Sequence, residues 1–146
     1  MQDSVKQDRE LYIGGSDIPV IMEISPFKSR YDLLLEKAGI KEDTFSGNIY
    51  TEYGNVMEPK IRDYINTSFS GVFRFKEGKH VREAKGDDPI GVRCHTDGES
   101  VDTVLEIKTT SQIFDNVDEY KVYLVQLLYY MVETNKTNGL LAVYER

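Results

Sequence analysis

The stretch from His95 to Thr110, His-Thr-Asp-Gly-Glu-Ser-Val-Asp-Thr-Val-Leu-Glu-Ile-Lys-Thr-Thr, decides the fold because it holds two strand-like runs and three charged side chains at suggestive positions. Successive side chains of a strand point to opposite faces, so Glu106 and Lys108 share one face of the second run. The Asp97-Gly98 pair predicts a tight turn between the two runs. Such a hairpin would bring Asp97 towards Glu106, so the sequence predicts two carboxylates beside one ammonium.

Length and composition favour a single soluble domain. The chain has 146 residues, of which 40% are apolar and 29% are charged, and we expect residues 1–146 to form one globular domain. No apolar run approaches the ~20 residues that span a bilayer, and the polar amino terminus lacks the apolar segment of a signal peptide. A cytoplasmic protein without a membrane partner is the expectation.

Cysteine usage limits the possible sites. Cys94 is the single cysteine, so an internal disulfide is excluded, and no Cys/His cluster has zinc or iron–sulfur spacing. We expect no iron–sulfur cluster and predict that Cys94 is a small core residue.

The charge balance is unusual for a nucleic-acid binder, since 25 acidic and 18 basic residues give a net charge of −7. A local basic groove or a bound divalent cation can reverse the sign of the potential where DNA is bound. The basic residues that could gather in such a groove are Lys28, Arg30, Lys60, Arg62, Lys121 and Lys136.

The first half of the chain predicts helices. After a lead-in over residues 1–10, Ser16 is predicted to cap a short helix that ends before Ser25-Pro26. Ser29 is predicted to begin a second helix that stops at Gly39. Apolar residues then recur at helical spacing from about Tyr50 to Phe69, which predicts a long amphipathic helix. Helical spacing places Glu58 on the side of Ile61 and Ile65, where a carboxylate is costly unless it is paired.

The second half predicts a sheet followed by one helix and a last strand. We expect short strands over 72–75, 79–83, 90–94, 104–109 and 140–144, and a helix over 116–134. The economical arrangement of the first four strands is an antiparallel meander. The fold class is therefore predicted to be α+β (mixed α/β), with a central mixed, largely antiparallel β-sheet flanked by helices.

The predicted cluster suits metal-assisted phosphodiester hydrolysis. Asp97, Glu106 and the carbonyl of Ile107 would form a hard oxygen site of the kind that Mg²⁺ or Mn²⁺ prefers. Lys108 would orient the attacking water or offset the charge that builds up on the phosphate. Glu58 from the long helix can add a ligand, and Gln126 can hold the water or the lysine.

The same residues have simpler interpretations. An acid followed by Glu-x-Lys also occurs on a solvated strand face with a cross-strand ion pair, and Glu58 also fits a helix-surface acid. His80 and His95 fit ordinary strand histidines, although His95 shares a strand face with Asp97 and could touch a substrate. Tyrosines at helical spacing, such as Tyr123 and Tyr130, fit core or interface positions.

Six fragments in a fixed order add a family resemblance. They are Ile13-Gly14-Gly15-Ser16-Asp17, Ser25-Pro26-Phe27, Gly54-Asn55-Val56-Met57-Glu58-Pro59, Thr96-Asp97-Gly98, Leu105-Glu106-Ile107-Lys108-Thr109-Thr110 and Tyr123-Leu124-Val125-Gln126. Together they resemble the YqaJ-type viral recombinases, phage exonucleases related to the lambda exonuclease within the PD-(D/E)XK nuclease superfamily. The resemblance spans roughly residues 9–145.

The resemblance implies a Mg²⁺-dependent exonuclease of a phage or prophage, acting in the bacterial cytoplasm. It implies digestion of linear double-stranded DNA from 5′ ends, which leaves a 3′ overhang for a single-strand annealing partner, and it is compatible with a homo-oligomer. By position, the metal ligands would be Asp97, Glu106, the Ile107 carbonyl and the additional acid Glu58; Lys108 would be the catalytic lysine, Gln126 would position the lysine or the water, and Arg9 and Ser16 would hold a terminal or scissile phosphate.

Two alternatives remain open on the sequence. One is another member of the same superfamily, such as an endonuclease or a nuclease subunit. The other is a non-catalytic acidic module that binds a partner protein. For a metal-free site, we expect repulsion among Asp97, Glu106 and Glu58 to raise the pKa of at least one carboxylate.

Overall fold

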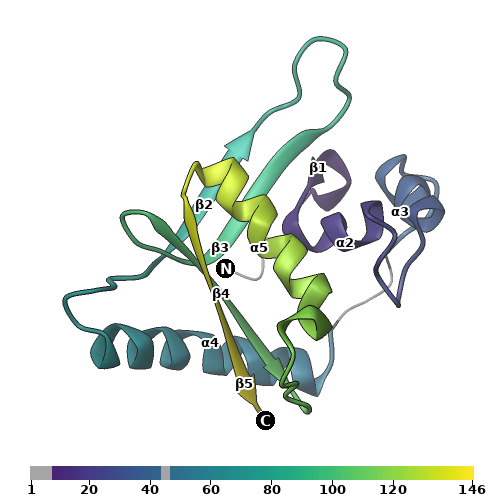
Figure 1. Ribbon diagram of the computed structural model, residues 1–146. Coiled ribbons are helices and arrows are strands. Elements are labelled where there is room, and N and C mark those ends of the chain that lie inside the picture. Colours follow the sequence, from purple (N-terminus) through teal and green to yellow (C-terminus); the bar gives the residue numbers. More distant parts are fainter. Residues whose placement is uncertain (1–7, 44–46) are drawn as a thin grey trace.

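A five-stranded mixed sheet forms the centre of the molecule, with helices on both of its faces (Figure 1). The computed structural model describes residues 8–43 and 47–146, so residues 1–7 of the predicted lead-in lie outside the described residues. Both the mixed sheet and its flanking helices were predicted from the sequence, and the fold class is confirmed.

The sheet has an antiparallel centre and parallel additions. β2 pairs antiparallel with β3, and β3 pairs antiparallel with β4, whereas β1 joins β3 and β5 joins β4 in parallel. The strands are β1 (Tyr12–Ile13), β2 (Lys76–Arg82), β3 (Gly91–Glu99), β4 (Thr103–Thr110) and β5 (Asn138–Glu145).

β3 is the strand on which the site depends, because its two edges are used differently. One edge pairs with β2 along most of its length. On the other edge, Gly91 and Val92 pair with β1, and Gly98 and Glu99 pair with β4. Among the described residues, 93–97 have no ladder partner on this second edge, so β1 and β4 diverge from β3 there and leave space between them.

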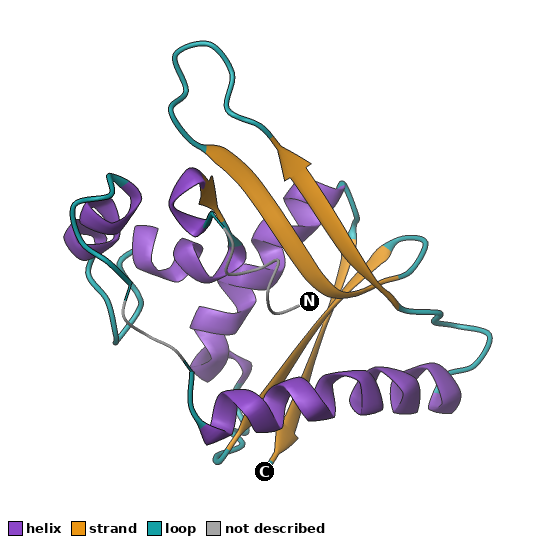
Figure 2. Ribbon diagram, turned by 180° about the vertical axis from the view of Figure 1, so that it is seen from behind, coloured by secondary structure: helices purple, strands orange, loops and turns teal. Residues whose placement is uncertain are grey.

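Two helices enclose the sheet from opposite sides, as Figures 1 and 2 show for α4 and α5 around β4 and β5. The helices are α2 (Ile18–Ile21), α3 (Arg30–Lys37), α4 (Ile49–Ser68) and α5 (Lys121–Thr134), with 3-10 turns η1 (Arg9–Leu11), η2 (Gly15–Asp17) and η3 (Val117–Tyr120). The predicted helix over 116–134 is thus a 3-10 turn followed by an α-helix. Of the helices in 8–43 and 47–146, none is long and apolar enough to cross a bilayer.

The core is divided between the two faces by the alternation of β4. Leu105 and Ile107 pack with Ile61 and Ile65 of α4, while Val104 packs with the apolar side chains of α5. Glu106 and Lys108 follow Val104 at strand spacing and therefore lie on the α5 side of β4. The predicted separation of the charged and the apolar side chains of this strand is confirmed.

The predicted strand over 72–75 is wrong. The side chain of Asn66 in α4 hydrogen-bonds both backbone polar groups of Phe75: its Oδ1 accepts from the Phe75 amide at 2.7 Å, and its Nδ2 donates to the Phe75 carbonyl at 3.0 Å. The rings of Phe73 and Phe75 stack with centroids 4.8 Å apart. This segment is therefore an apolar link that is tied to α4 rather than a ladder strand.

The predicted turn at Asp97-Gly98 is also wrong, because both residues lie inside β3. The connection to β4 is formed by residues 100–102, where the Ser100 amide donates to the Thr103 carbonyl at 2.9 Å. Gly98 is needed for packing instead: a Cβ there would stand 2.8 Å from the Cβ of Phe75. The hairpin was predicted correctly, but its turn lies further along the chain.

The start of the first helix differs from the prediction as well. Ser16 does not cap it; the Gly14 amide donates to the Asp17 carboxylate at 2.9 Å and closes a 3-10 turn that precedes α2. Ser29, in contrast, caps α3 as predicted, since its hydroxyl accepts from the Asp32 amide at 3.1 Å. The long helix α4 begins and ends within a residue of the predicted bounds.

Candidate active site

A cavity of about 480 Å³ opens beside the unpaired edge of β3. Its walls come from η1, β1, η2, α3, α4, β2, β3, β4 and α5, so it gathers segments that are far apart in the sequence. All predicted site side chains line it: Arg9, Ser16, Glu58, Asp97, Glu106, Lys108 and Gln126.

Asp97 bridges the gap between the diverging strands. Its Oδ2 accepts a hydrogen bond from the Ile107 amide at 2.7 Å, so a side chain takes the place of a ladder bond between β3 and β4. The amide and carbonyl of one strand residue point to the same side, so the Ile107 carbonyl also faces Asp97. Burial raises the pKa of Asp97 well above its usual value, helped by a hydrogen bond and charge from Glu58, and the Ile107 amide opposes this.

Glu106 and Lys108 form an ion pair on the neighbouring strand, with 3.1 Å between Nζ and Oε1. The other carboxylate oxygen of Glu106, Oε2, is buried and has no hydrogen-bond partner among the described residues. Burial raises the pKa of Glu106 to about 7, while the Lys108 ammonium acts against that rise. For Lys108 itself burial lowers the pKa, but the charges of Glu106 and Asp97 outweigh it, so the net pKa is raised.

The expected rise in carboxylate pKa is therefore present, but its predicted cause needs correction. The sequence suggested that like-charge repulsion dominates. In the structure the largest cause is burial for both Asp97 and Glu106, and the neighbouring carboxylates come after it.

Glu58 reaches the cavity from α4 and is accompanied by an arginine. Its carboxylate is 3.7 Å from the guanidinium of Arg62, one helical turn later. The same guanidinium donates to the Asp97 carbonyl at 2.9 Å and lies 3.2 Å from Glu77. Only 12% of the Arg62 side chain is exposed, and its guanidinium pairs with Glu58 and Glu77 inside the fold. Arg62 therefore does not contribute to an outer basic groove. The predicted inward direction of Glu58 is observed.

The α5 wall contributes two side chains one turn apart. Gln126 and Tyr130 are both buried, and both line the cavity. Tyr130 lies so close to Gly15 that any Cβ at position 15 would collide with its hydroxyl, which explains why a glycine stands there. Tyr130 is thus a core residue, as the sequence suggested, and also part of the cavity wall.

Arg9 and Ser16 meet at the rim of the cavity. The Arg9 guanidinium donates to the Ser16 hydroxyl at 3.4 Å and lies 3.5 Å from the Asp43 carboxylate. An arginine beside a hydroxyl is a suitable pair of donors for a phosphate group.

Two further residues of β3 line the cavity: His95, which the sequence placed on the same strand face as Asp97, and Arg93, which the sequence did not single out. Both precede Asp97 at strand spacing, and this alternation was the signal that could have found Arg93 as well. The Arg93 guanidinium lies 4.7 Å from the ring centroid of Tyr12. Burial, and then the charges of Arg93 and Lys79, lower the pKa of His95 to about 4, so its imidazole is neutral at neutral pH. His80, by comparison, is an exposed residue of β2 beside Glu99.

The comparisons with known proteins agree with this geometry. The model of the YqaJ-like viral recombinase domain matches residues 5–137. The chain belongs to the YqaJ-like viral recombinase family. The resemblance read from the six sequence fragments is thereby confirmed.

Relatives of this YqaJ-like chain are distant. The uncharacterized protein MG373 of Mycoplasma genitalium is 31% identical over 110 residues, which are 68% of this chain and 39% of that protein. The chain thus spans about two fifths of this relative's length. Among solved structures, SSO0001 superimposes with a TM-score of 0.63 at 16% identity, over 99% of this chain and 67% of the other. LHK-Exo, a lambda-exonuclease-like protein crystallised with dAMP, superimposes with a TM-score of 0.58 at 17% identity, over 94% of this chain and 71% of the other. These two likenesses show a shared fold.

Proposed function

We propose that this YqaJ-like chain is a metal-dependent deoxyribonuclease that digests linear double-stranded DNA from its ends. The observation that carries the proposal is the convergence of Asp97, Glu106 and Lys108 where β3 and β4 diverge. The family and the fold of LHK-Exo, which was crystallised with dAMP, support a nuclease role. Digestion from 5′ ends, leaving 3′ overhangs for a single-strand annealing partner, is part of the proposal.

A divalent cation, Mg²⁺ with Mn²⁺ as substitute, fits the chemistry of the acids. Across residues 8–43 and 47–146, no three His, Cys, Asp or Glu side chains are already arranged as a metal site. Within this part of the chain the buried Oε2 of Glu106 nevertheless lacks a hydrogen-bond partner, and burial disfavours the charged forms of Asp97 and Glu106, which a bound cation would compensate. Carboxylate and carbonyl oxygens are the ligands that these ions prefer. We assign Asp97, Glu106, the Ile107 carbonyl and Glu58 as the residues that would hold it.

Each of the other side chains then has a part in hydrolysis. The cation, when bound, polarises the phosphodiester and makes a bound water easier to deprotonate. Lys108, kept protonated by its acidic neighbours, orients that water or offsets the charge on the phosphate. Gln126 supports the lysine or the water from α5. Arg9 and Ser16 bind the phosphate at the end of the strand.

The test is digestion of linear and covalently closed circular duplexes of the same sequence, with Mg²⁺ or with EDTA. We expect Mg²⁺-dependent loss of the linear form alone, and no loss with Glu106→Ala. Separate 5′ and 3′ end labels report the polarity. Cutting of the circle would replace the proposal with an endonuclease, and no cutting of either form would favour a nuclease subunit or an acidic partner-binding module.

A further inference from the structure

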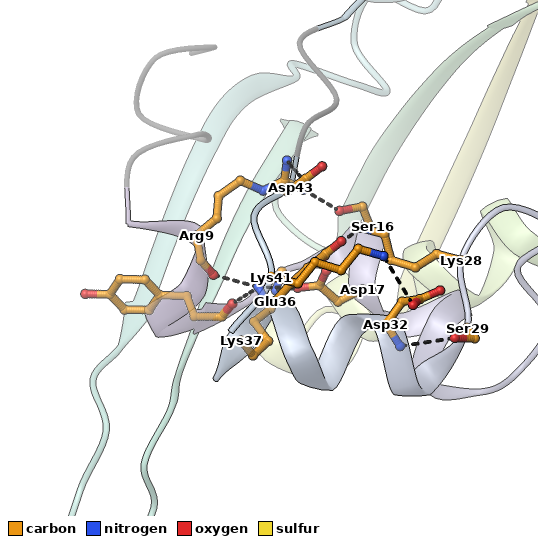
Figure 3. Close-up of polar contacts among 12 residues, drawn as sticks. Arg9, Ser16, Asp17, Lys28, Ser29, Asp32, Glu36, Lys37, Lys41 and Asp43 are labelled. Carbon is orange, nitrogen blue, oxygen red and sulfur yellow. Dashed lines mark hydrogen bonds and ion pairs between the residues drawn. The ribbon is translucent and has the colours of Figure 1, made fainter. Parts of the chain in front are cut away.

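The ammonium of Lys37, at the end of α3, is saturated by acceptors from outside its own helix (Figure 3). Its Nζ donates to the carbonyl oxygens of Arg9 and Tyr12, each at 2.6 Å, and lies 3.1 Å from Oδ2 of Asp17. An ammonium has three N–H donors, so these contacts use all of them. Lys37 lines the cavity, but in this arrangement it has no donor left for a substrate.

The three acceptors belong to one short segment, residues 9–17. This segment carries Arg9 and Ser16, the two side chains that meet at the cavity rim. Asp17 extends the network, because its Oδ2 also accepts from the Gly14 amide at 2.9 Å. One ammonium, on a side chain that is 14% exposed, therefore contacts the beginning, the middle and the end of the segment that presents the predicted phosphate donors.

Few other contacts hold η1 in place, whereas further along the segment Gly15 packs against Tyr130 and the Tyr12 hydroxyl donates to Glu83 at 2.8 Å. η1 contains no buried residue, and β1 is a two-residue strand, Tyr12–Ile13. The hydroxyl of Tyr129 donates to the Ile13 carbonyl over a long 3.4 Å. Without apolar burial, the position of η1 depends mainly on polar contacts, and the shortest of these come from Lys37.

The helix that carries Lys37 is anchored independently of it. Leu33 of α3 is buried, and the Arg30 guanidinium donates twice to the Ile21 carbonyl, at 3.1 and 2.8 Å. Lys28 and Glu36 add an ion pair at 2.8 Å. Loss of the Lys37 ammonium should therefore leave α3 in place and release the segment that it holds.

We propose that Lys37 is a positioning residue that holds Arg9 and Ser16 where they receive the terminal phosphate of a DNA strand, an inference that rests on the proposed function. Without the ammonium, two carbonyls lose their donor and the Asp17 carboxylate, with 9% of its side chain exposed, loses its cation. A buried charge that loses its partner forces the surrounding segment to rearrange. Small displacements of positioning groups weaken catalysis strongly, so recognition of the phosphate should fall.

The test compares Lys37→Met and Lys37→Arg with Lys41→Met as the matched control. Lys41 lies beyond the same helix with 52% of its side chain exposed, in an ion pair with Asp32. Two quantities are measured: hydrogen exchange of the amides in residues 9–17, and the ratio of kcat/KM for duplexes with 5′-phosphate and 5′-hydroxyl ends. Lys37→Met should speed exchange in this segment alone and reduce the ratio by on the order of tenfold or more through KM. Both quantities for Lys37→Arg should lie between those of the wild type and of Lys37→Met, and both for Lys41→Met should match the wild type.

Unchanged exchange in residues 9–17, or an unchanged ratio in a folded Lys37→Met protein, would overturn the inference. The rise in the temperature of unfolding on adding Mg²⁺ should persist in all three variants, which separates a moved phosphate site from a damaged metal site. A wild-type protein that digests no DNA would refute the proposed function. The exchange measurement would still decide whether Lys37 holds the segment.

Discussion

Glu106→Gln should stabilise the metal-free protein while abolishing hydrolysis. The substitution keeps the size of the side chain and retains an acceptor for Lys108, but it removes a negative charge from a buried position. That charge is costly because Oε2 has no partner among the residues that the structure describes. The buried charge of Glu106 would then lower the stability of the metal-free fold and at the same time provide a ligand for a cation.

The size of the effect follows from the pKa of Glu106, which rises from 4.5 in the unfolded chain to about 7 in the fold. Between these values the folded state binds more protons, so the stability of the wild type falls as pH rises through this window. At about 1.36 kcal/mol per pH unit, the ceiling above pH 7 is about 3 kcal/mol. This pKa already includes the attraction of the Lys108 ammonium, so the full difference of about 3 kcal/mol should favour the variant at pH 8.

The assay is denaturant unfolding in EDTA at pH 8 and at pH 5, with Glu119→Gln as a control that removes one exposed acid of the same type. At pH 5 the advantage of Glu106→Gln should shrink below about 1 kcal/mol, because Glu106 is then protonated in the wild-type fold. Saturating Mg²⁺ should stabilise the wild type and not the variant. A variant that is less stable at pH 8, or equally favoured at both pH values, would refute the charge argument.

Three further predictions concern other parts of the site and core. Lys108→Met should lower kcat by on the order of 100-fold and preserve the Mg²⁺-induced rise in unfolding temperature; loss of that rise would give Lys108 a structural role. Gly15→Ala should cost about 1–3 kcal/mol of unfolding free energy through its collision with Tyr130, whereas Gly14→Ala, with its nearest neighbour 3.6 Å away, should stay within about 0.5 kcal/mol, and equal costs would contradict the packing argument. Burial raises the pKa of Cys94 to about 11, so iodoacetamide at pH 8 should label it in unfolded protein only, as read by mass spectrometry; fast labelling of the native protein would count against its burial.

The parts of the fold that could be predicted are those that follow from local periodicity. The two-residue alternation of β4 separated Glu106 and Lys108 from Leu105 and Ile107, and the structure keeps this separation. The helical repeat of α4 directed Glu58 towards the site for the same reason. Periodicity reports which face is buried, and a charged side chain on a buried face stands out against it.

The parts that could not be predicted depend on contacts between distant residues. Nothing near Phe75 in sequence indicates that Asn66 takes over its backbone hydrogen bonds. Gly98 has the composition of a turn, yet its role is to admit the side chain of Phe75. The sequence placed Arg62 among the cations of a possible basic groove and did not single out Lys37, and only the fold shows that each contacts acceptors from other segments.

The unpaired edge of β3 also bears on how the protein avoids aggregation. A strand edge without a neighbour is a template on which a strand of another molecule can add. Here the open part carries Arg93, His95 and Asp97, whose side chains line the cavity, and β1 and β4 close it at both ends. Charged groups that point inwards along an edge discourage such addition. The chemistry of the site and the solubility of the fold therefore draw on the same side chains, and an inactive variant made with apolar substitutions would be expected to self-associate where an amide substitution would not.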